Sequence, residues 1–128
     1  MTHGNKDATQ PASTVPYSAS PGGEQFPLPQ PQDYAGEFKR VQVLAERARS
    51  DGKEIVVVMG VGFVGAVMAA IVADTKDTQG RSSKFVIGCQ RPSTRSYWKI
   101  PLLNRGEAPV TAEDPEVEAI IQRCVSEK

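Results

Sequence analysis

The chain has 128 residues, of which 15 are basic and 15 acidic, so its formal net charge at pH 7 is zero. This balance gives no electrostatic reason to expect nucleic acid or an anionic membrane surface as a partner. The length allows one small domain, and the N-terminus lacks the apolar segment of a signal peptide, so we expect a cytoplasmic protein.

Residues 1–32 are rich in Pro, Ser, Thr, Gln and Gly and poor in large apolar side chains. Such a segment buries too little surface to offset the entropy lost on ordering, so we predict a disordered N-terminal tail. A docking peptide is the alternative interpretation, because Pro27, Pro29 and Pro31 favour a local polyproline conformation. The folded domain is expected at 33–128.

An amphipathic helix is predicted over 33–50, because apolar residues recur there at spacings of three and four. Asp33 is the predicted N-cap, and Ser50-Asp51-Gly52 ends the helix. We interpret this element as a packing helix without chemistry. Its predicted apolar stripe consists of Phe38, Val41, Leu44, Ala45 and Ala48.

The stretch from Lys53 to Ala73 organises the rest of the chain. Residues 55–58 are all β-branched, which predicts a strand at 54–59 that is buried on both faces. Gly60, Gly62 and Gly65 follow with the spacing G-x-G-x-x-G, and a helix is predicted from about 63 to 74. A strand, a tight glycine turn and a helix form the context in which this motif binds a dinucleotide.

Each glycine of the motif has its own predicted task. Gly60 allows the sharp turn out of the strand, Gly62 lets the backbone approach a pyrophosphate, and Gly65 lets the helix pack closely on the strand. The amides that open the helix would then face the phosphates, aided by the helix dipole.

Two other interpretations of this stretch remain open. Residues 55–73 form an uncharged apolar run that is long enough for a membrane-spanning helix. Three glycines within the run and flanks of mixed charge argue against such a helix. The second alternative is a glycine-rich turn that binds nothing. A Walker-type loop is excluded, because no Lys-Ser or Lys-Thr follows the glycines.

The remaining elements complete an α/β pattern. A surface loop is predicted at 75–83, and a second strand at 84–89 should pair parallel to the first through a right-handed crossover. Pro92 opens a helical stretch through Trp98 that Pro101 should kink or end. Asn104-Arg105-Gly106 is a predicted turn, and Asp114-Pro115 begins the last helix. The predicted fold class is therefore α/β: a partial Rossmann-like βαβα unit with an N-terminal packing helix and a disordered tail.

Residues 53–125 resemble the N-terminal portion of nucleotide-sugar dehydrogenases, the UDP-glucose/GDP-mannose dehydrogenase family. The resemblance rests on the strand with G-x-G-[FY]-V-G, on the second strand, and on Asn104-Arg105-Gly106 followed by Pro109. It implies an NAD-dependent oxidoreductase of polysaccharide biosynthesis that oxidises the C6 alcohol of a nucleotide sugar to a carboxylate through an enzyme-bound thioester. It also implies backbone contacts to the cofactor pyrophosphate from Gly60, Val61, Gly62, Phe63 and Val64.

The chain departs from this family at the end of the second strand. Family members usually have an Asp there, which binds the adenosine ribose, whereas this chain has Cys89-Gln90-Arg91 with Gln90 as the closest match. An uncharged amide should bind a ribose more weakly than a carboxylate does. The resemblance implies NAD as the cofactor. Arg91 lies either in solvent or against a 2′-phosphate, so NADP is the alternative cofactor.

The second departure concerns catalysis. The family's catalytic cysteine, lysine and asparagine lie in later domains, and neither Cys89 nor Cys124 lies in the catalytic motif, so we predict no catalytic residue and no metal site. We expect a truncated part that needs a complementary C-terminal chain, or that forms a homo-oligomer. The alternative is a non-catalytic Rossmann-like interaction module.

Overall fold

The computed structural model describes residues 15–109 and 115–126. Along the chain its elements are β1 (Tyr17–Ala19), β2 (Gln25–Pro27), α1 (Pro31–Ser50), β3 (Glu54–Met59), α2 (Phe63–Ala73), β4 (Lys84–Cys89), α3 (Lys99–Asn104) and α4 (Glu116–Ser126).

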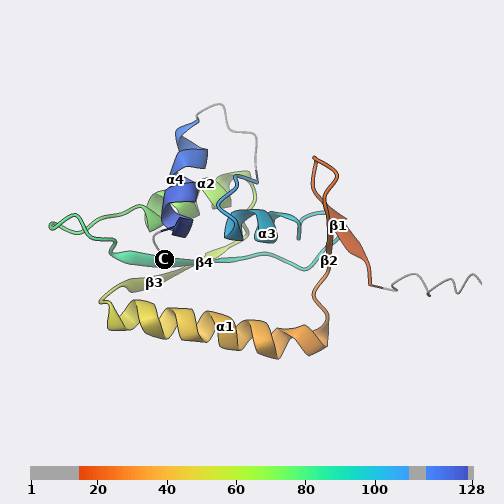
Figure 1. The fold of residues 1–128 in the computed structure, drawn as a ribbon, viewed down its shortest axis with the longest axis horizontal. Helices are drawn as coiled ribbons and strands as arrows, with labels where there is room; N and C mark the ends of the chain where they lie inside the picture. The colour runs from red at the N-terminus through yellow and green to blue at the C-terminus, as the bar shows by residue number, and fades with distance from the viewer. Residues whose placement is uncertain (1–14, 110–114, 127–128) are drawn as a thin grey trace, which may run out of the picture.

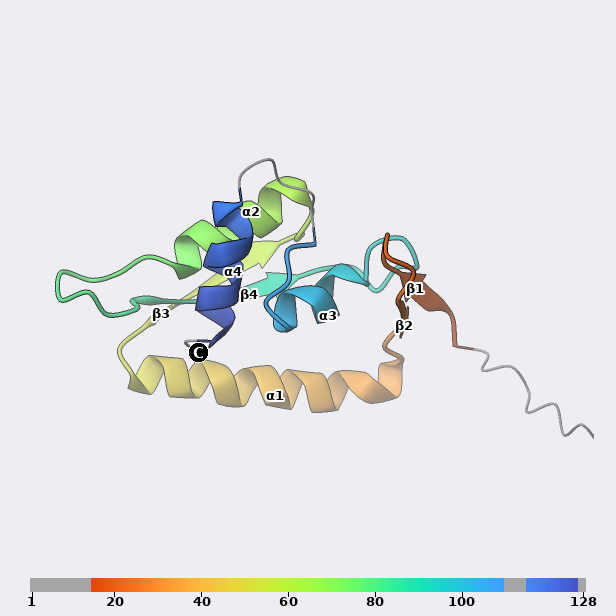
Figure 2. The same cartoon turned by 45° about the horizontal axis from the view of Figure 1, so that its top comes forward.

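A small parallel sheet lies at the centre of the fold. β3 pairs with β4 over their whole lengths, with Glu54 opposite Lys84 and Met59 opposite Cys89. Helix α1 lies on one face of this sheet and α2 lies on the other, while α4 packs against α2 and α3 packs against α4 (Figures 1 and 2). The positions of both predicted strands, their parallel pairing and the helix between them are confirmed. Mixed helix and strand around a parallel pair is consistent with a partial α/β Rossmann-like unit.

Helix α1 begins at Pro31, two residues before the predicted start. Proline suits the first helical position, because its fixed φ is helical and its missing N–H would have no intrahelical partner. The prediction that Asp33 is the N-cap is therefore wrong. Asp33 lies at the third helical position, where its Oδ2 accepts a hydrogen bond of 2.8 Å from the backbone N–H of Gln30, the residue that caps the helix.

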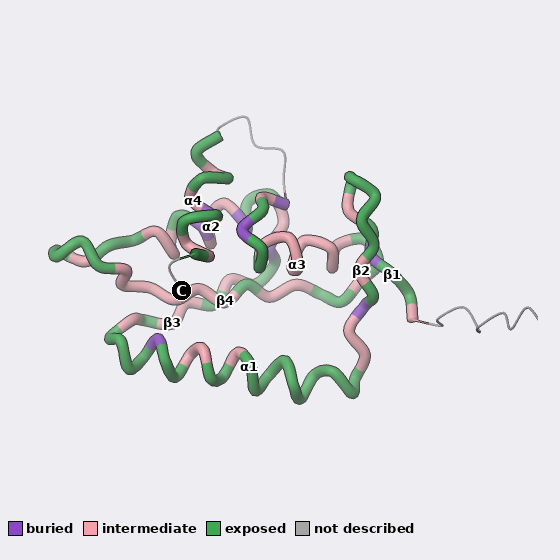
Figure 3. The backbone as a smooth tube through the Cα atoms, in the orientation of Figure 1, coloured by how far each residue is buried: buried purple, intermediate pink, exposed green. Residues whose placement is uncertain are grey.

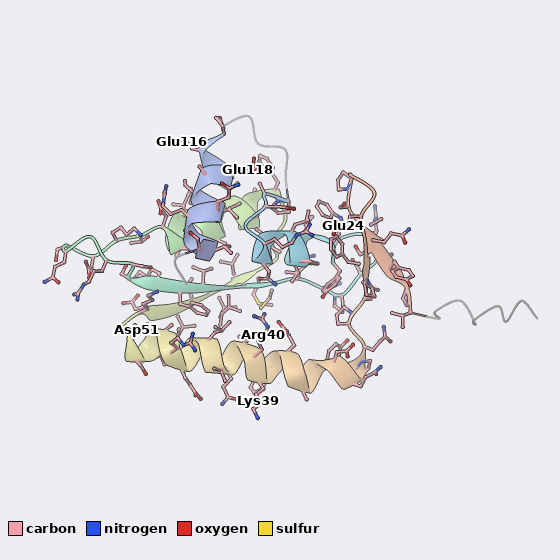
Figure 4. All side chains as sticks on the ribbon, viewed as in Figure 1. Glu24, Lys39, Arg40, Asp51, Glu116 and Glu118 are labelled. Carbon is pink, nitrogen blue, oxygen red and sulfur yellow. The ribbon has the colours of Figure 1, made fainter. Side chains whose placement is uncertain are left out.

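The apolar stripe of α1 is only partly covered (Figure 3). Ala48 is buried as predicted, but Phe38 is 71% exposed. Two strands lie only about 4.8 Å apart, whereas a helix with its side chains is about 10 Å across, so this sheet cannot cover the full width of the stripe. Figure 4 shows Arg40 on the side of α1 that faces the sheet and Lys39 on the opposite side.

The prediction that β3 is buried on both faces is wrong. Val57 is 53% exposed and Met59 is 80% exposed. Within the described residues β3 pairs only with β4, so each strand has one open edge and the side chains at the end of β3 lack neighbours. A β-branched run favours a strand that is covered on both faces, and the described residues cover this strand only in part.

The structure also corrects the predicted tail. β1 and β2 form an antiparallel hairpin with Tyr17 opposite Pro27, and the last two residues of the predicted tail, Pro31 and Gln32, belong to α1. The first fourteen residues of the predicted tail lie outside the described residues.

Long-range contacts hold this hairpin in place. The side chain of Ser18 is fully buried, and its Oγ accepts a hydrogen bond of 2.9 Å from the backbone N–H of Trp98. Both terminal nitrogens of Arg105 donate to the carboxylate of Glu24 at 2.9 Å, and its guanidinium lies 5.7 Å from the Phe26 ring centroid. These partners come from about 80 residues further along the chain, so the composition of the hairpin segment could not reveal them.

The region after β4 differs from the prediction as well. Residues 94–98 form turns, and the helix lies later, at Lys99–Asn104. Pro101 does not end this helix, because it lies in the first turn, where an N–H has no intrahelical acceptor. The predicted turn at Asn104-Arg105-Gly106 is confirmed, with Gly106 at a φ of 82°. Asp114, the predicted cap of the last helix, lies outside the described residues.

Acid is expected to release the hairpin. The hydrogen bonds from Arg105 hold the pKa of Glu24 below its ordinary value of 4.5. A carboxylate whose pKa is lowered on folding stabilises the fold above its unfolded pKa, and this stabilisation is lost as the pH falls through the folded value. We therefore expect the hairpin to stay docked at neutral pH and to loosen below about pH 4.5.

Trp98, the one tryptophan of the chain, reports this change through its fluorescence, because its backbone donates to Ser18. The matched variant is Arg105→Gln, which removes the charge that favours ionised Glu24. Its fluorescence change between pH 5 and pH 3 should be smaller than that of the parent protein. Identical titration curves for the two proteins would contradict this assignment.

Candidate functional site

The glycine turn between β3 and α2 is fixed by the side chain of Val61. Val61 is 1% exposed and packs against β4 at Gly88. A Cβ atom at position 88 would lie 2.7 Å from Cγ1 of Val61, so the close approach of turn and strand requires glycine there. We did not predict a role for Gly88; a glycine inside a strand is the signal that could have indicated one.

Two glycines of the motif are required by the fold itself. Gly60 has a φ of 90°, which disfavours any residue with a side chain, and its N–H donates to the carbonyl of Cys89 at 2.7 Å. Gly65 packs against the start of the turn, where an added Cβ would lie 1.8 Å from the carbonyl oxygen of Gly60. These positions match the predicted tasks of a sharp turn and close helix packing.

Gly62 differs from the other two. Its φ of −70° and ψ of −160° are accessible to ordinary residues, and no atom lies within 4 Å of a Cβ built at this position. Neither backbone conformation nor packing therefore requires glycine at position 62. The space beside its backbone is open, as a ligand that approaches the main chain would need.

The N-terminus of α2 offers amide donors next to this open space. No side chain caps the helix, and its first turn contains no acidic residue. In the described part of the chain, the N–H groups of Phe63 and Val64 have no hydrogen-bond acceptor, and the two residues are 62% and 68% exposed. Uncapped amides at the positive end of a helix form an anion-binding surface.

Gln90 lies against the glycine turn. Its Oε1 accepts a hydrogen bond of 3.0 Å from the N–H of Val61, and its Nε2 donates to Oγ of Ser96 at 3.0 Å. Ser96 in turn shares a hydrogen bond of 2.6 Å with Ser93. The structure thus brings Gln90 together with the turn, and it places Arg91, which is exposed, at the start of the adjoining loop.

Ser93 and Ser96 were not predicted to belong to the site. Their sequence context, a short polar run after a strand, does not distinguish them from ordinary loop residues. Their role depends on the turns at 94–98, which we predicted as helix. The hydroxyl pair fixes the orientation of the Gln90 amide, because the amide nitrogen needs an acceptor and Ser96 provides it.

A cavity of about 220 Å³ lies elsewhere, beside β4 and between α1 and the helices on the other face of the sheet. Most of its lining is aliphatic and includes Val41, Leu44, Ile87, Ile121 and Val125. It is a partly open groove along β4, and Gly62 does not line it. Among the described residues, no group of three or more His, Cys, Asp or Glu side chains could hold a metal ion, and no helix is both long and apolar enough to cross a membrane.

No family model and no curated protein matches the chain. Among solved structures, it is similar to the crystal structure of NDP-N-acetyl-D-galactosaminuronic acid dehydrogenase from Methanosarcina mazei, with 34% sequence identity and a TM-score of 0.50. The match covers 65% of this chain but only 17% of that protein. The predicted resemblance to the N-terminal portion of a nucleotide-sugar dehydrogenase is thereby confirmed.

Proposed function

We propose that this chain is the dinucleotide-binding N-terminal part of a nucleotide-sugar dehydrogenase, with the cofactor pyrophosphate over Gly62 and the first amides of α2. One observation carries this proposal: Gly62 is the glycine of the motif that the fold does not need, and the space beside it is open. A glycine that folding does not require fits a surface that a ligand must approach closely. The similar dehydrogenase supports the same conclusion.

The residues of the turn fit the cofactor in distinct ways. The N–H groups of Phe63 and Val64, which have no acceptor in the described residues, would donate to phosphate oxygens, and Val61 and Gln90 would keep the turn in the shape that presents them. An NAD-type cofactor, when bound, supplies the hydride acceptor for oxidation of an alcohol. The second lone pair of Gln90 Oε1 remains available for one ribose hydroxyl.

The reaction itself needs groups that we do not assign to this chain. The chain spans 17% of the similar dehydrogenase. We propose that oxidation of a nucleotide-sugar C6 alcohol to a carboxylate takes place only when a complementary C-terminal portion supplies the catalytic residues. The chain by itself is then expected to bind the cofactor without turnover.

Gly62→Val should abolish NAD binding while the fold stays intact. The valine side chain would occupy the space that the pyrophosphate needs, and no atom outside the neighbouring residues lies within 4 Å of its Cβ position. Titration calorimetry with NAD measures the binding, and urea unfolding measures the stability. The matched control is Gly36→Val, the same substitution at a glycine of α1 that likewise has nothing within 4 Å.

We expect NAD to bind the parent protein and the Gly36→Val variant alike, and Gly62→Val to lose binding with an unchanged urea midpoint. Equal NAD affinity in all three proteins would refute the pyrophosphate site. Absence of both NAD and NADP binding in the parent would instead favour the second candidate function.

That second candidate is a non-catalytic interaction module. It is favoured by an uncovered apolar face of α2, where Val64, Met68 and Ile71 follow one another at helical spacing and are each more than half exposed. The uncovered end of β3 at Met59 adds to this apolar surface. A complementary C-terminal portion would also pack here, so cofactor binding is the measurement that separates the two candidates.

A further inference from the structure

We propose that the loop after β4, residues 91–96, binds the 2′-phosphate of NADP, so that this site prefers NADP to NAD. The inference rests on the proposed function, because it assigns the adenosine half of the same dinucleotide site. The groups proposed to bind the phosphate are the guanidinium groups of Arg91 and Arg95 and the hydroxyls of Ser93 and Ser96.

The loop 91–96 follows the end of β4. Parallel strands end at one edge of their sheet, where dinucleotides bind, and the residue at the end of the second strand faces the adenosine ribose. In this chain the end of β4 is joined to the glycine turn by the hydrogen bond between Gln90 and Val61. The residues that directly follow Gln90 therefore lie where the 2′ position of the ribose would be.

The loop and the residues around it carry only positive charge. The stretch 89–100 contains Arg91, Arg95 and Lys99 but no acidic residue. A carboxylate at the strand end would accept hydrogen bonds from both ribose hydroxyls and repel a 2′-phosphate. Gln90 has no charge and therefore does not repel a 2′-phosphate, and its Oε1, already bonded to Val61, can accept from at most one ribose hydroxyl.

Arg91 and Arg95 are available to bind a phosphate. Both Arg91 and Arg95 are exposed, and neither binds a carboxylate within residues 15–109 and 115–126. Several other arginines do form such pairs: Arg40, Arg81, Arg105 and Arg123. The backbone at Arg95 is held by a hydrogen bond of 3.0 Å from Nε1 of Trp98 to its carbonyl. Guanidinium groups bind phosphate oxygens through paired, charge-assisted hydrogen bonds.

The hydroxyls of Ser93 and Ser96 leave one donor without an acceptor in the described residues. Ser96 accepts from Gln90, and one hydroxyl hydrogen is used between Ser96 and Ser93. Whichever of the two serines donates in that bond, the hydroxyl hydrogen of the other has no acceptor in the described residues. The loop can therefore offer two guanidinium groups and one hydroxyl to a phosphate.

The test compares NADP with NAD, and 2′,5′-ADP with 5′-ADP, on the full chain by titration calorimetry. The parent protein should bind NADP about tenfold or more tightly than NAD. The double variant Arg91→Ala/Arg95→Ala should lower the affinity for NADP and 2′,5′-ADP by about tenfold or more and change the affinity for NAD less than about twofold. The matched control is Arg47→Ala/Arg49→Ala, which removes two exposed arginines at the C-terminal end of α1, beside the opposite end of the strands.

The outcomes separate this inference from the proposed function. If the parent binds NAD as tightly as NADP, the inference fails and the dinucleotide site stands. If the double variant loses 5′-ADP as strongly as 2′,5′-ADP, the arginines attract any anion and the 2′-phosphate assignment is overturned. Loss of both NAD and NADP in Gly62→Val, with preference for NADP in the parent, supports both proposals together.

Discussion

Gly65→Ala is expected to destabilise the fold by about 3 kcal/mol or more, the upper range for overpacking. The added methyl group would lie 1.8 Å from the carbonyl oxygen of Gly60, which is a backbone atom and cannot move without the turn. Relief requires α2 to move away from the end of β3, which would disturb the packing of Ala66, 1% exposed at the next position of the helix. Urea unfolding followed by circular dichroism measures the change.

Gly36→Ala is the matched control for this experiment. Gly36 lies within α1 with no atom near its Cβ position, so alanine there should stabilise the helix by about 0.5–1 kcal/mol. Opposite signs for the same substitution are therefore expected at the two glycines. A Gly65→Ala protein as stable as its parent would mean that α2 does not pack on the turn as described.

Gly88→Ala is expected to cost about 1–3 kcal/mol through a clash with Val61. The methyl group would lie 2.7 Å from Cγ1 of a side chain that is 1% exposed and, being β-branched, has little rotamer freedom. Urea unfolding of Gly88→Ala measures the cost. Because Val61 anchors the glycine turn, NAD affinity should fall together with stability in this variant.

A double-mutant cycle identifies the clash as the cause. Val61→Ala leaves a small cavity and destabilises the fold by itself, but it removes the atom that the alanine at position 88 would meet. The double variant should therefore be more stable than the sum of the two changes predicts, by about 0.5–3 kcal/mol. Strict additivity would show that the two residues do not touch.

Sequence reasoning succeeded where the controlling interactions are local. The β-branched run before Gly60 and the second run before Gly88 predicted both strands and their pairing, because short-range conformational preference and a crossover of this length leave few topologies. The glycine motif also predicted the turn. The sequence could not separate Gly62 from Gly60 and Gly65, since that distinction depends on which atoms surround each Cβ position.

It failed where distant residues decide the structure. The hairpin at 17–27 has the composition of a disordered segment, and it is ordered by Trp98 and Arg105. The resemblance suggested Gln90 as a ribose ligand, but its contact with Ser96 depends on turns at 94–98 that were predicted as helix. In both cases tertiary contacts override a local pattern.

The position of the hairpin has a consequence for how the chain is made. Its partner Trp98 is 80 residues downstream of Ser18, whereas β3 and β4 pair across about 30 residues. A ribosome adds roughly 5–20 residues per second, so residue 98 follows residue 18 by roughly 4–16 seconds. During that interval the segment that emerges first has no docking surface. The parallel unit is then expected to close before the hairpin docks, because the shorter loop costs less entropy, and the hairpin then attaches to a surface that already exists.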